Sequence, residues 1–407
     1  GHRWKAEGTG RAFNYCREIA RAASETLKPE TQAKLRKASF ASGVEKMARC
    51  DPTHSIRQED WDADPWALGC PTMTINLRSG EAYDPHPADR ITRVTAVAPA
   101  ETTRCPQWLE FLHDATGGDD EMIGFLRRWC GYSLTGLTRE HALIFLYGPG
   151  GNGKSVFLNT VSGILGDYAT TAAMDTFTAS GASQHLTFLA MMKGARMVTA
   201  SETEEGRAWA EARIKQMTGG DPITANYMRR DPFTFVPQFK LTIVGNHQPV
   251  LHNVDDAARR RFNIVPFTVK PSNPDRELED KLKREWPGIL RWMIEGCLEW
   301  QEHGLQRPER VAAATADYFS DQDMVGQWLA DCATVEPENE HRWEAAADLF
   351  KSWKDYALAA GEQPGTAKSL ASKMARHGLR RTTKKPAGRA QKVWLGVTLN
   401  KPESWHD

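Results

Sequence analysis

The chain has 407 residues, 40% of them hydrophobic, and equal numbers of basic and acidic side chains, 52 of each. At ~100 to 200 residues per domain, this length predicts several domains with buried cores, and the balanced charge excludes a protein that is basic or acidic throughout. The seven cysteines are widely spaced and form no CxxC pair, which argues against a disulfide framework or a zinc site and favours a reducing cytosol. No apolar run approaches the ~20 residues of a membrane helix, so we expect no membrane partner.

The first third of the chain is predicted to be helical at both ends and irregular between them. Apolar residues recur at helical spacing over 11–47 and again over 108–134. Between 51 and 105, Pro, Asp and Thr surround short β-prone pieces at 73–77 and 91–97. We therefore expect a mostly helical, loop-rich region before the first strong motif. Its abrupt beginning suggests a piece of a longer chain and leaves open whether a primase domain precedes it.

The strongest motif is the run 148–155, Gly-Pro-Gly-Gly-Asn-Gly-Lys-Ser, which fits GxxxxGK[S/T] at every fixed position. It lies between the apolar run 142–147 and a predicted helix over 156–165, as a phosphate loop requires. Glycines turn backbone N–H groups toward a phosphate, Lys154 reaches the β and γ phosphates, and Ser155 offers a hydroxyl to Mg²⁺. The alternative is a chance glycine turn. We predict that ATP is bound by Gly148, Pro149, Gly150, Gly151, Asn152, Gly153, Lys154, Ser155 and Val156.

Two later strand-like runs end in polar side chains suited to hydrolysis. The run 196–200 is followed by Ser201 and Glu202, and the run 240–245 by Asn246. Because parallel strands present their carboxyl ends at one edge of a sheet, both side chains are expected beside the phosphate loop. There Glu202 would polarise the attacking water or hold the metal's water shell, and Asn246 would hydrogen-bond the γ-phosphate or that water. The alternatives are an ordinary exposed glutamate and an ordinary turn asparagine.

Strand-like runs at 233–236 and 263–268 complete a pattern of strands alternating with helices, which predicts an α/β sheet. Just before the second run stand three adjacent arginines, 259–261. They are either a surface basic cluster or the source of an arginine finger that reaches a neighbouring subunit's γ-phosphate. A finger contributes a factor of ~10³ to 10⁵ in rate. The finger interpretation requires a ring of subunits.

The last part of the chain predicts a helix over 341–360, a second helix over 366–377 and a two-strand pattern to 399, which is the winged-helix order. No acidic residue occurs between Glu362 and Glu403. The stretch is thus strongly basic within a neutral chain. The alternatives to a DNA-binding role are a protein-docking module and a solvated basic wing. We predict contacts to duplex or origin DNA by Lys368, Lys373, Arg376, Arg380 and Arg381.

The order of these motifs resembles superfamily 3 helicases, particularly phage and plasmid primase-helicases and the poxvirus primase-helicase. The resemblance extends over roughly 60–400 and includes Lys215-Gln-Met-Thr-Gly-Gly-Asp221, Gly245-Asn246-His-Gln-Pro and Arg260-Arg261-Phe followed by Ile264-Val-Pro-Phe267. It implies an AAA+ motor that forms a hexameric ring, hydrolyses ATP between subunits and moves along single-stranded DNA. It also implies phage or mobile-element origin and the cytoplasm of a bacterial host.

The resemblance implies roles for individual residues. Lys154 and Ser155 match the Walker A pair, Glu202 the Walker B acid, Asn246 the sensor, and Arg261 the finger, with Arg260 as the second candidate. Ser155 and Glu202 would hold Mg²⁺. Lys215 matches an additional motif and is a further predicted DNA contact. After that motif, the stretch 223–231 would form a hairpin in the ring's pore. On that hairpin, Tyr227, Arg229 and Arg230 suit single-stranded DNA, by base stacking and by cation–phosphate contacts. The alternative is a solvated hairpin.

We therefore predict an α/β AAA+ P-loop ATPase core flanked by a mostly helical N-terminal domain and a C-terminal winged helix. The expected function is an ATP-dependent DNA helicase, the motor part of a primase-helicase, acting on single-stranded and forked DNA. The alternatives are an ATPase that remodels a protein partner at a DNA site without unwinding and, with less support, a small-molecule kinase. The predicted domains are 1–138, helical and loop-rich; 139–270, ATPase core; 271–338, helical subdomain; and 339–407, winged helix.

Overall fold

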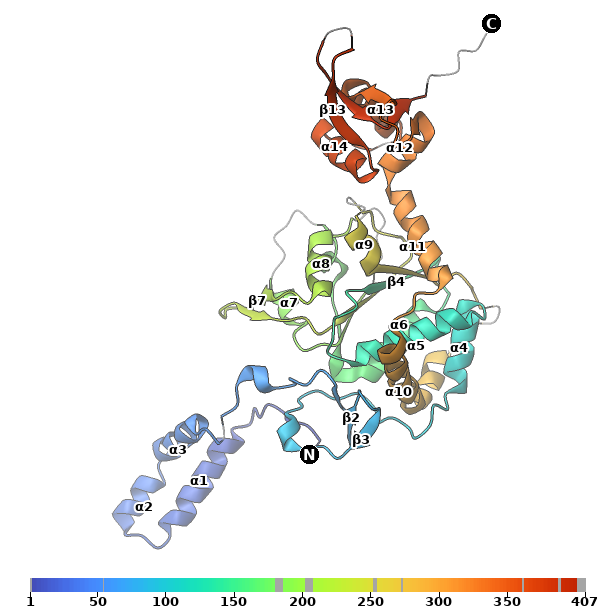
Figure 1. Cartoon of the computed structure of the whole chain (residues 1–407). Helices are drawn as coiled ribbons and strands as arrows, with labels where there is room; N and C mark the ends of the chain where they lie inside the picture. Colours follow the sequence, from blue (N-terminus) through green and yellow to red (C-terminus); the bar gives the residue numbers. More distant parts are fainter. Residues whose placement is uncertain are drawn as a thin grey trace.

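The computed structural model describes residues 2–53, 55–179, 186–201, 208–251, 255–271, 274–360, 362–386 and 389–400. The molecule is elongated, with a three-helix unit at one end, an α/β body in the middle and a C-terminal unit at the other end (Figure 1). Within the described ranges, no helix is both long enough and apolar enough to span a bilayer. The mixed α/β architecture, its parallel central sheet and its helical N-terminal region agree with the sequence prediction.

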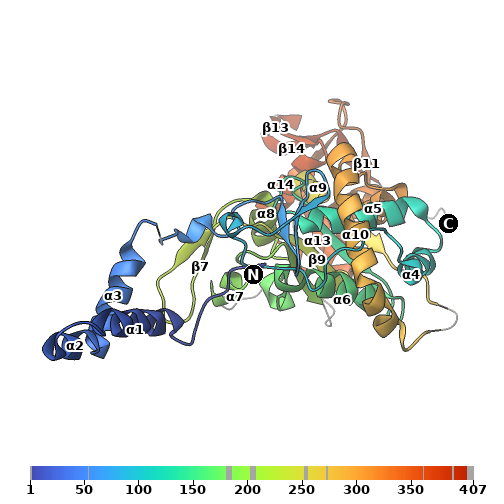
Figure 2. The same ribbon diagram turned by 90° about the horizontal axis from the view of Figure 1, so that it is seen from below.

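The N-terminal unit consists of α1 (Arg11–Ser24), α2 (Pro29–Leu35) and α3 (Ala38–Cys50). These helices confirm the helical spacing over 11–47. They pack mainly on one another and project from the body (Figures 1 and 2). Few of their side chains are buried, and apolar residues such as Ile19 and Met47 remain 67% and 77% exposed.

A small antiparallel sheet follows, made of β1 (Ala67–Gly69), β2 (Thr74–Asn76) and β3 (Glu81–Tyr83). Strand β2 confirms the β-prone piece at 73–77. The prediction for 91–97 was wrong, because this segment forms no strand. The backbone of this segment forms isolated hydrogen bonds with other segments, such as the one from the Thr95 N–H to the Gly69 carbonyl at 3.0 Å. These bonds build no ladder.

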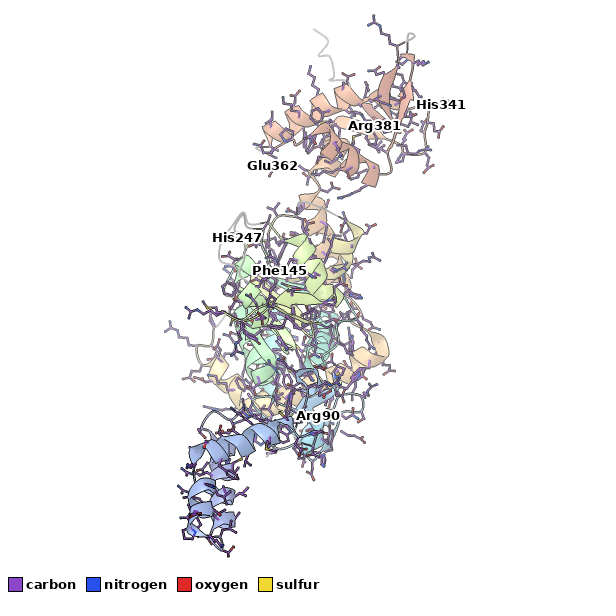
Figure 3. The ribbon with its side chains drawn as sticks, turned by 90° about the vertical axis from the view of Figure 1, so that its left-hand side faces the viewer. Arg90, Phe145, His247, His341, Glu362 and Arg381 are labelled. Atoms are coloured by element: carbon purple, nitrogen blue, oxygen red, sulfur yellow. The ribbon has the colours of Figure 1, made fainter. Side chains whose placement is uncertain are left out.

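The central sheet has five parallel strands in the order β10-β4-β9-β6-β5. Their side chains are buried almost throughout, as expected for parallel strands with helices on both faces. Figure 3 shows Phe145, from the middle of β4, inside the body. Four strands match predicted runs and β5 was not predicted. Their bounds are β4 (Leu143–Tyr147), β5 (Ala169–Thr171), β6 (Met197–Ser201), β9 (Lys240–Gly245) and β10 (Phe262–Pro266).

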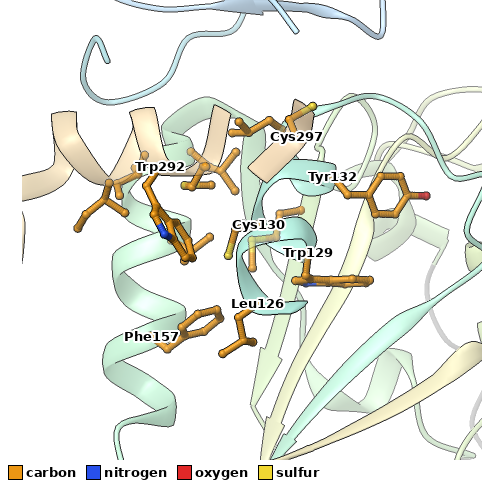
Figure 4. Close-up of a cluster of buried hydrophobic side chains, with 14 of the residues drawn as sticks. Leu126, Trp129, Cys130, Tyr132, Phe157, Trp292 and Cys297 are labelled. Atoms are coloured by element: carbon orange, nitrogen blue, oxygen red, sulfur yellow. The ribbon is translucent and has the colours of Figure 1, made fainter. Parts of the chain in front are cut away.

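One face of the sheet is covered by α4 (Pro106–Thr116), α5 (Asp120–Leu134), α6 (Lys154–Leu165) and α10 (Leu278–His303). Large side chains from these helices meet in one core, in which Trp108 stacks on Phe157 and contacts Trp292 edge to face. Figure 4 shows part of this core, where Leu126 and Cys130 of α5 lie on the side of Phe157 and Trp292, and Trp129 and Tyr132 point to the other side of α5. Helix α10, which follows the last strand of the sheet, thus packs on α4 and α5, which precede the first. This packing holds α4 and α10 together beside the phosphate loop.

The other face of the sheet has a second core, to which α7 (Leu186–Ala190), α8 (Glu211–Gly219), α9 (Asp256–Arg261) and α11 (Glu309–Gln322) contribute. Strands β7 (Ile223–Ala225) and β8 (Phe233–Phe235) form an antiparallel hairpin outside the central sheet. The run predicted at 233–236 is therefore a strand, but it belongs to this hairpin. Short 3₁₀ turns connect elements at Gln58–Asp60, Pro87–Asp89, Gly166–Tyr168 and Met174–Thr176.

The C-terminal unit has its own core. A helix, a second helix and a hairpin follow one another as predicted, and α12, before them, packs into the same core. The elements are α12 (Met324–Cys332), β11 (Ala333–Val335), β12 (Trp343–Ala345), α13 (Ala346–Ala359), α14 (Ala367–Arg376), β13 (Arg380–Lys384), β14 (Gln391–Leu395) and β15 (Val397–Leu399). Strand β14 pairs with both β13 and β12, and β11 pairs with β15. Figure 3 shows Arg381 in this unit, remote from the central sheet.

Candidate nucleotide and DNA sites

The loop 148–153 joins the buried strand β4 to helix α6, in the strand–loop–helix context that the sequence predicted. Two of its glycines are required by their surroundings. A Cβ at Gly148 would lie 1.9 Å from the Phe267 carbonyl oxygen, so the loop can pass the end of β10 only without a side chain. Gly153 has φ of 85° and lies against the ring of Phe111, from which a Cβ would be 2.7 Å away. The loop therefore has a fixed path.

Lys154 begins α6 and is only 4% exposed. Its Nζ donates hydrogen bonds to the Gly148 carbonyl at 2.7 Å and to Asn152 Oδ1 at 2.8 Å. Burial lowers the pKa of this ammonium. The charge is thus held inside the loop by neutral acceptors, and a phosphate would supply the opposite charge that the loop itself lacks.

Asn152 connects the loop to the sheet. Its side chain is 2% exposed, and its Nδ2 donates to the Phe267 carbonyl at the end of β10 while its Oδ1 accepts from Lys154. The sequence predicted Asn152 only as one residue of the binding loop. Its bracing role was missed, because Phe267 is far away in the chain and the GxxxxGK[S/T] pattern leaves position 152 open.

The strand ends bring the predicted polar residues to the same edge of the sheet. Strand β9 lies between β4 and β6, so Asn246 follows the strand next to the phosphate loop. Asn246 Oδ1 is 3.9 Å from the position that a Cβ on Gly150 would occupy. Ser201 ends β6 at this edge, and Glu202 lies outside the described residues. The structure thus brings together Lys154, Ser155 and Asn246.

A cavity of about 760 Å³ opens above this edge. The loop and Asn246 line its floor, and Ser155 lies exposed at the start of α6. Side walls come from α4 and from the chain that enters α10, elements for which the sequence predicted no role in binding. Wall residues include Gln107, Glu110, Phe111, Asp114, Pro271, Pro274, Asp275, Leu278 and Lys281. A cavity of this volume, with a polar floor and a wall that combines Phe111 and Leu278 with polar side chains, suits a nucleotide.

Helix α9 carries Arg260 and Arg261, and neither lines this cavity. Each binds a carbonyl of its own helix: Arg260 Nε donates to Asp256 O at 3.3 Å, and Arg261 Nη1 to Ala257 O at 2.9 Å. Arg261 Nε is buried and has no hydrogen-bond partner in the described part of the chain. Within one chain, these arginines therefore do not meet Lys154.

Lys215 belongs to α8, not to the hairpin, and its side chain contacts the N-terminal end of α9. Its Nζ forms an ion pair with Asp255 Oδ2 at 2.5 Å. Asp255 also caps α9 by accepting the Ala258 N–H at 2.7 Å. Burial alone would raise the pKa of Asp255, but these two hydrogen bonds outweigh it and hold the pKa below its ordinary value. The direct role of Lys215 is thus to fix the start of the arginine helix.

The predicted hairpin is present, and its tip exposes the predicted DNA contacts. Tyr227 is 41% exposed and stacks on Phe233, with ring centroids 5.1 Å apart and an interplanar angle of 23°. Arg229 and Arg230 are exposed in the turn, and Arg229 has φ of 59°. The ring of Tyr227 is thus supported from one side, and two cations stand beside it.

In the C-terminal unit the basic residues lie on two elements. Lys368, Lys373 and Arg376 are on α14, and Arg380 and Arg381 begin β13. Arg380 is paired with Glu340 at 2.8 Å, whereas Arg381 and Lys368 are exposed. The cations therefore do not form one continuous helix face.

Comparisons with known proteins agree with this architecture. The family model "D5 N terminal like" matches residues 1–117, and a model described as "Family of unknown function (DUF5906)" matches residues 146–261. A protein of Acanthamoeba polyphaga mimivirus, named as a candidate helicase, is 26% identical over 259 residues, covering 58% of this chain and 27% of its own length. A second, from Frog virus 3 and named in the same way, is 23% identical over 260 residues, covering 58% of this chain and 26% of its own length.

The chain spans about a quarter of the length of these curated relatives. Its fold is similar to a solved structure of the NrS-1 C-terminal region, with a TM-score of 0.50 and 10% identity, covering 82% of this chain and 83% of that one. Both viral relatives carry names that describe them as helicases. The two family models and the viral relatives support a phage and viral primase-helicase family for this chain, in agreement with the motif order.

Proposed function

We propose that this chain is the motor part of an ATP-dependent DNA helicase of the primase-helicase type. The single observation that carries the proposal is the meeting of Lys154, Ser155 and Asn246 at one sheet edge, beneath a cavity large enough for a nucleotide. The viral relatives named as helicases support the same role.

In the proposed reaction, the γ-phosphate of ATP replaces Gly148 and Asn152 as the partner of Lys154. Burial of Lys154 strengthens this contact, because a charge pair is stronger where water is excluded. The hydroxyl of Ser155 and the carboxylate of Glu202 are hard oxygen donors of the type that Mg²⁺ prefers. When bound, Mg²⁺ would neutralise charge on the phosphates. Asn246 would orient the attacking water.

We propose that the site is completed by Arg261 of an adjacent subunit, with Arg260 as the second candidate. Both arginines lie outside their own chain's cavity, and Arg261 Nε has no partner among the described residues. A guanidinium used in trans fits these facts. A closed ring, which we propose to be a hexamer, supplies such a neighbour to every site.

DNA would be held at two places. The exposed hairpin tip, with Tyr227, Arg229 and Arg230, offers a stacking ring and two cations for single-stranded DNA. The C-terminal unit would act as a winged helix, with α14 and the β13–β14 hairpin on duplex DNA at an origin or fork. Nucleotide hydrolysis would then shift the hairpin and draw the strand through the ring.

A strand-displacement assay tests the proposal. The chain should release a labelled strand from a forked duplex in the presence of ATP and Mg²⁺, and the Lys154→Ala variant should not. DNA-stimulated hydrolysis with no strand release would instead favour the alternative, an ATPase that remodels a protein partner. The assay should include a longer form of the protein, since the chain spans about a quarter of its relatives' length.

A further inference from the structure

A charged cleft lies between the body and the C-terminal unit, outside the nucleotide site. Its volume is about 390 Å³, and it is lined by α9 on one side and by α12 and α14 on the other. Figure 1 shows α14 at the edge of the C-terminal unit that faces α9. The cations of the cleft are Arg259 of α9 and Lys373 and Arg376 of α14, and His377 follows α14 at its edge.

Two of the carboxylates in the cleft already have partners. Asp255 accepts from Lys215 and from the N–H of Ala258. Asp323 accepts the Gly326 N–H at 3.0 Å and lies 3.2 Å from His377 Nε2. The charge of Asp255 is therefore compensated by Lys215, whereas Asp323 meets a backbone N–H and the His377 ring. A third carboxylate, Asp256 at the start of α9, also lines the cleft.

The three cations of the cleft, Arg259, Lys373 and Arg376, form no ion pair among the described residues, although the charges of Arg376 and Arg259 help to lower the pKa of Asp255 and of Asp323. Among the described residues, no carboxylate lies within 4.0 Å of the charged nitrogens of Arg259, Lys373 or Arg376. Arg259 is fixed in place by Phe319, whose ring centroid is 5.1 Å from its guanidinium carbon. Lys373 and Arg376 are three residues apart on α14 and so share one face of the helix. Cations thus face the cavity from both of its walls.

We propose that this cleft binds a phosphate of the DNA backbone, held by Arg259 from the body and by Lys373 and Arg376 from the C-terminal unit. The inference rests on the proposed function for its choice of DNA. A backbone phosphate fits better than a free anion because α14, which supplies two of the cations, also carries the exposed Lys368. A three-cation clamp around one group of oxygens is the arrangement that phosphate recognition uses.

This site would link DNA to hydrolysis. Arg259 directly precedes Arg260 and Arg261 on the short helix α9. DNA bound in the cleft would therefore contact α9, the helix that carries the proposed arginine finger. A contact by the C-terminal unit alone would leave α9 untouched.

The test is the salt dependence of binding to a fluorescein-labelled duplex, measured without nucleotide between 50 and 200 mM KCl. Each lost phosphate contact lowers the slope of log affinity against log salt by about 0.9 on duplex DNA. We expect Arg259→Gln to lower the slope by up to about one and Arg259→Lys to preserve it. In a Lys373→Ala, Arg376→Ala background, Arg259→Gln should have little further effect, because the shared phosphate is already lost.

The matched control for the α14 variant is Lys351→Ala with Lys354→Ala, which removes two positive charges from exposed positions on α13, and Lys351→Ala alone is the control for Arg259→Gln. A wild-type slope in Arg259→Gln, or full additivity with the α14 variants, would overturn the clamp. The clamp would also be overturned if Arg259→Gln lost binding of inorganic phosphate but kept the wild-type salt slope for duplex DNA. Failure of the wild-type chain to bind duplex would instead defeat the proposed DNA partner. Thermal unfolding of each variant checks that it is folded.

Discussion

Removal of the Asn152 side chain should destabilise the body and impair nucleotide binding together. Asn152→Ala deletes two buried hydrogen bonds and leaves the Phe267 carbonyl without its side-chain donor. A buried polar group left unsatisfied costs about 1–3 kcal/mol. Since 1 kcal/mol shifts the melting temperature of a 150–250-residue unit by ~2–4 °C, the expected loss is roughly 2–12 °C. Lys154 also loses an acceptor that positions it, so the KM for ATP should rise.

Differential scanning calorimetry, without nucleotide and with ATP and EDTA, measures the first effect, and steady-state ATP hydrolysis measures the second. The matched control is Asn159→Ala on α6, the helix that follows the loop; among the described residues, its side chain bonds to Glu279 at an exposed position. A melting temperature for Asn152→Ala equal to that of the control would refute the idea that Asn152 braces the loop against β10.

Three other outcomes are expected. Lys154→Ala should abolish ATP turnover, measured by phosphate release, while leaving the fold intact. Burial lowers the pKa of Lys154, which means that the buried charge is costly, so its removal should cost little folding stability. Arg229→Ala with Arg230→Ala should weaken single-stranded DNA binding and reduce its salt slope by about 1.4 for two phosphates, with DNA-independent hydrolysis unchanged. The pKa of Asp255 is lowered in the folded chain from 3.8, so its stabilising effect is present above that pH and declines as pH falls through the folded value. Asp255→Asn should therefore flatten the acid side of a melting-temperature profile between pH 3 and 6, and an unchanged profile would contradict this.

Much of the nucleotide site could be predicted because its signals are local. The buried run before Gly148, the glycine pattern and the helix after Lys154 lie within about 25 residues, and each is dictated by sterics or by hydrogen bonding. Asn246 was found from the order of strands, since parallel strands end at one edge of a sheet. The place of β9 between β4 and β6 follows only from the fold.

Other features depended on contacts distant in the chain. The cavity walls from Phe111 and Leu278 arise because α10 packs on α4 and α5, and no pattern near either residue indicates a nucleotide. Segment 91–97 has β propensity and lies beside the edge strand β1, but the Tyr168 hydroxyl accepts from the Gly69 N–H and donates to the Arg93 carbonyl, so no ladder forms between them. Lys215 was predicted as a DNA contact from a motif, and only the structure reveals its ion pair with Asp255. The role of Lys215 on DNA stays a prediction.

The central claim is that each nucleotide site is shared between two subunits, and complementation tests it most directly. Lys154→Ala and Arg261→Ala chains should each be inactive alone, yet an equal mixture assembled into rings should recover about a quarter of the wild-type hydrolysis rate, because one interface in four pairs an intact Lys154 with an intact Arg261. A mixture that stays inactive although mass measurement shows mixed rings would contradict the account, as would full activity of Arg261→Ala by itself.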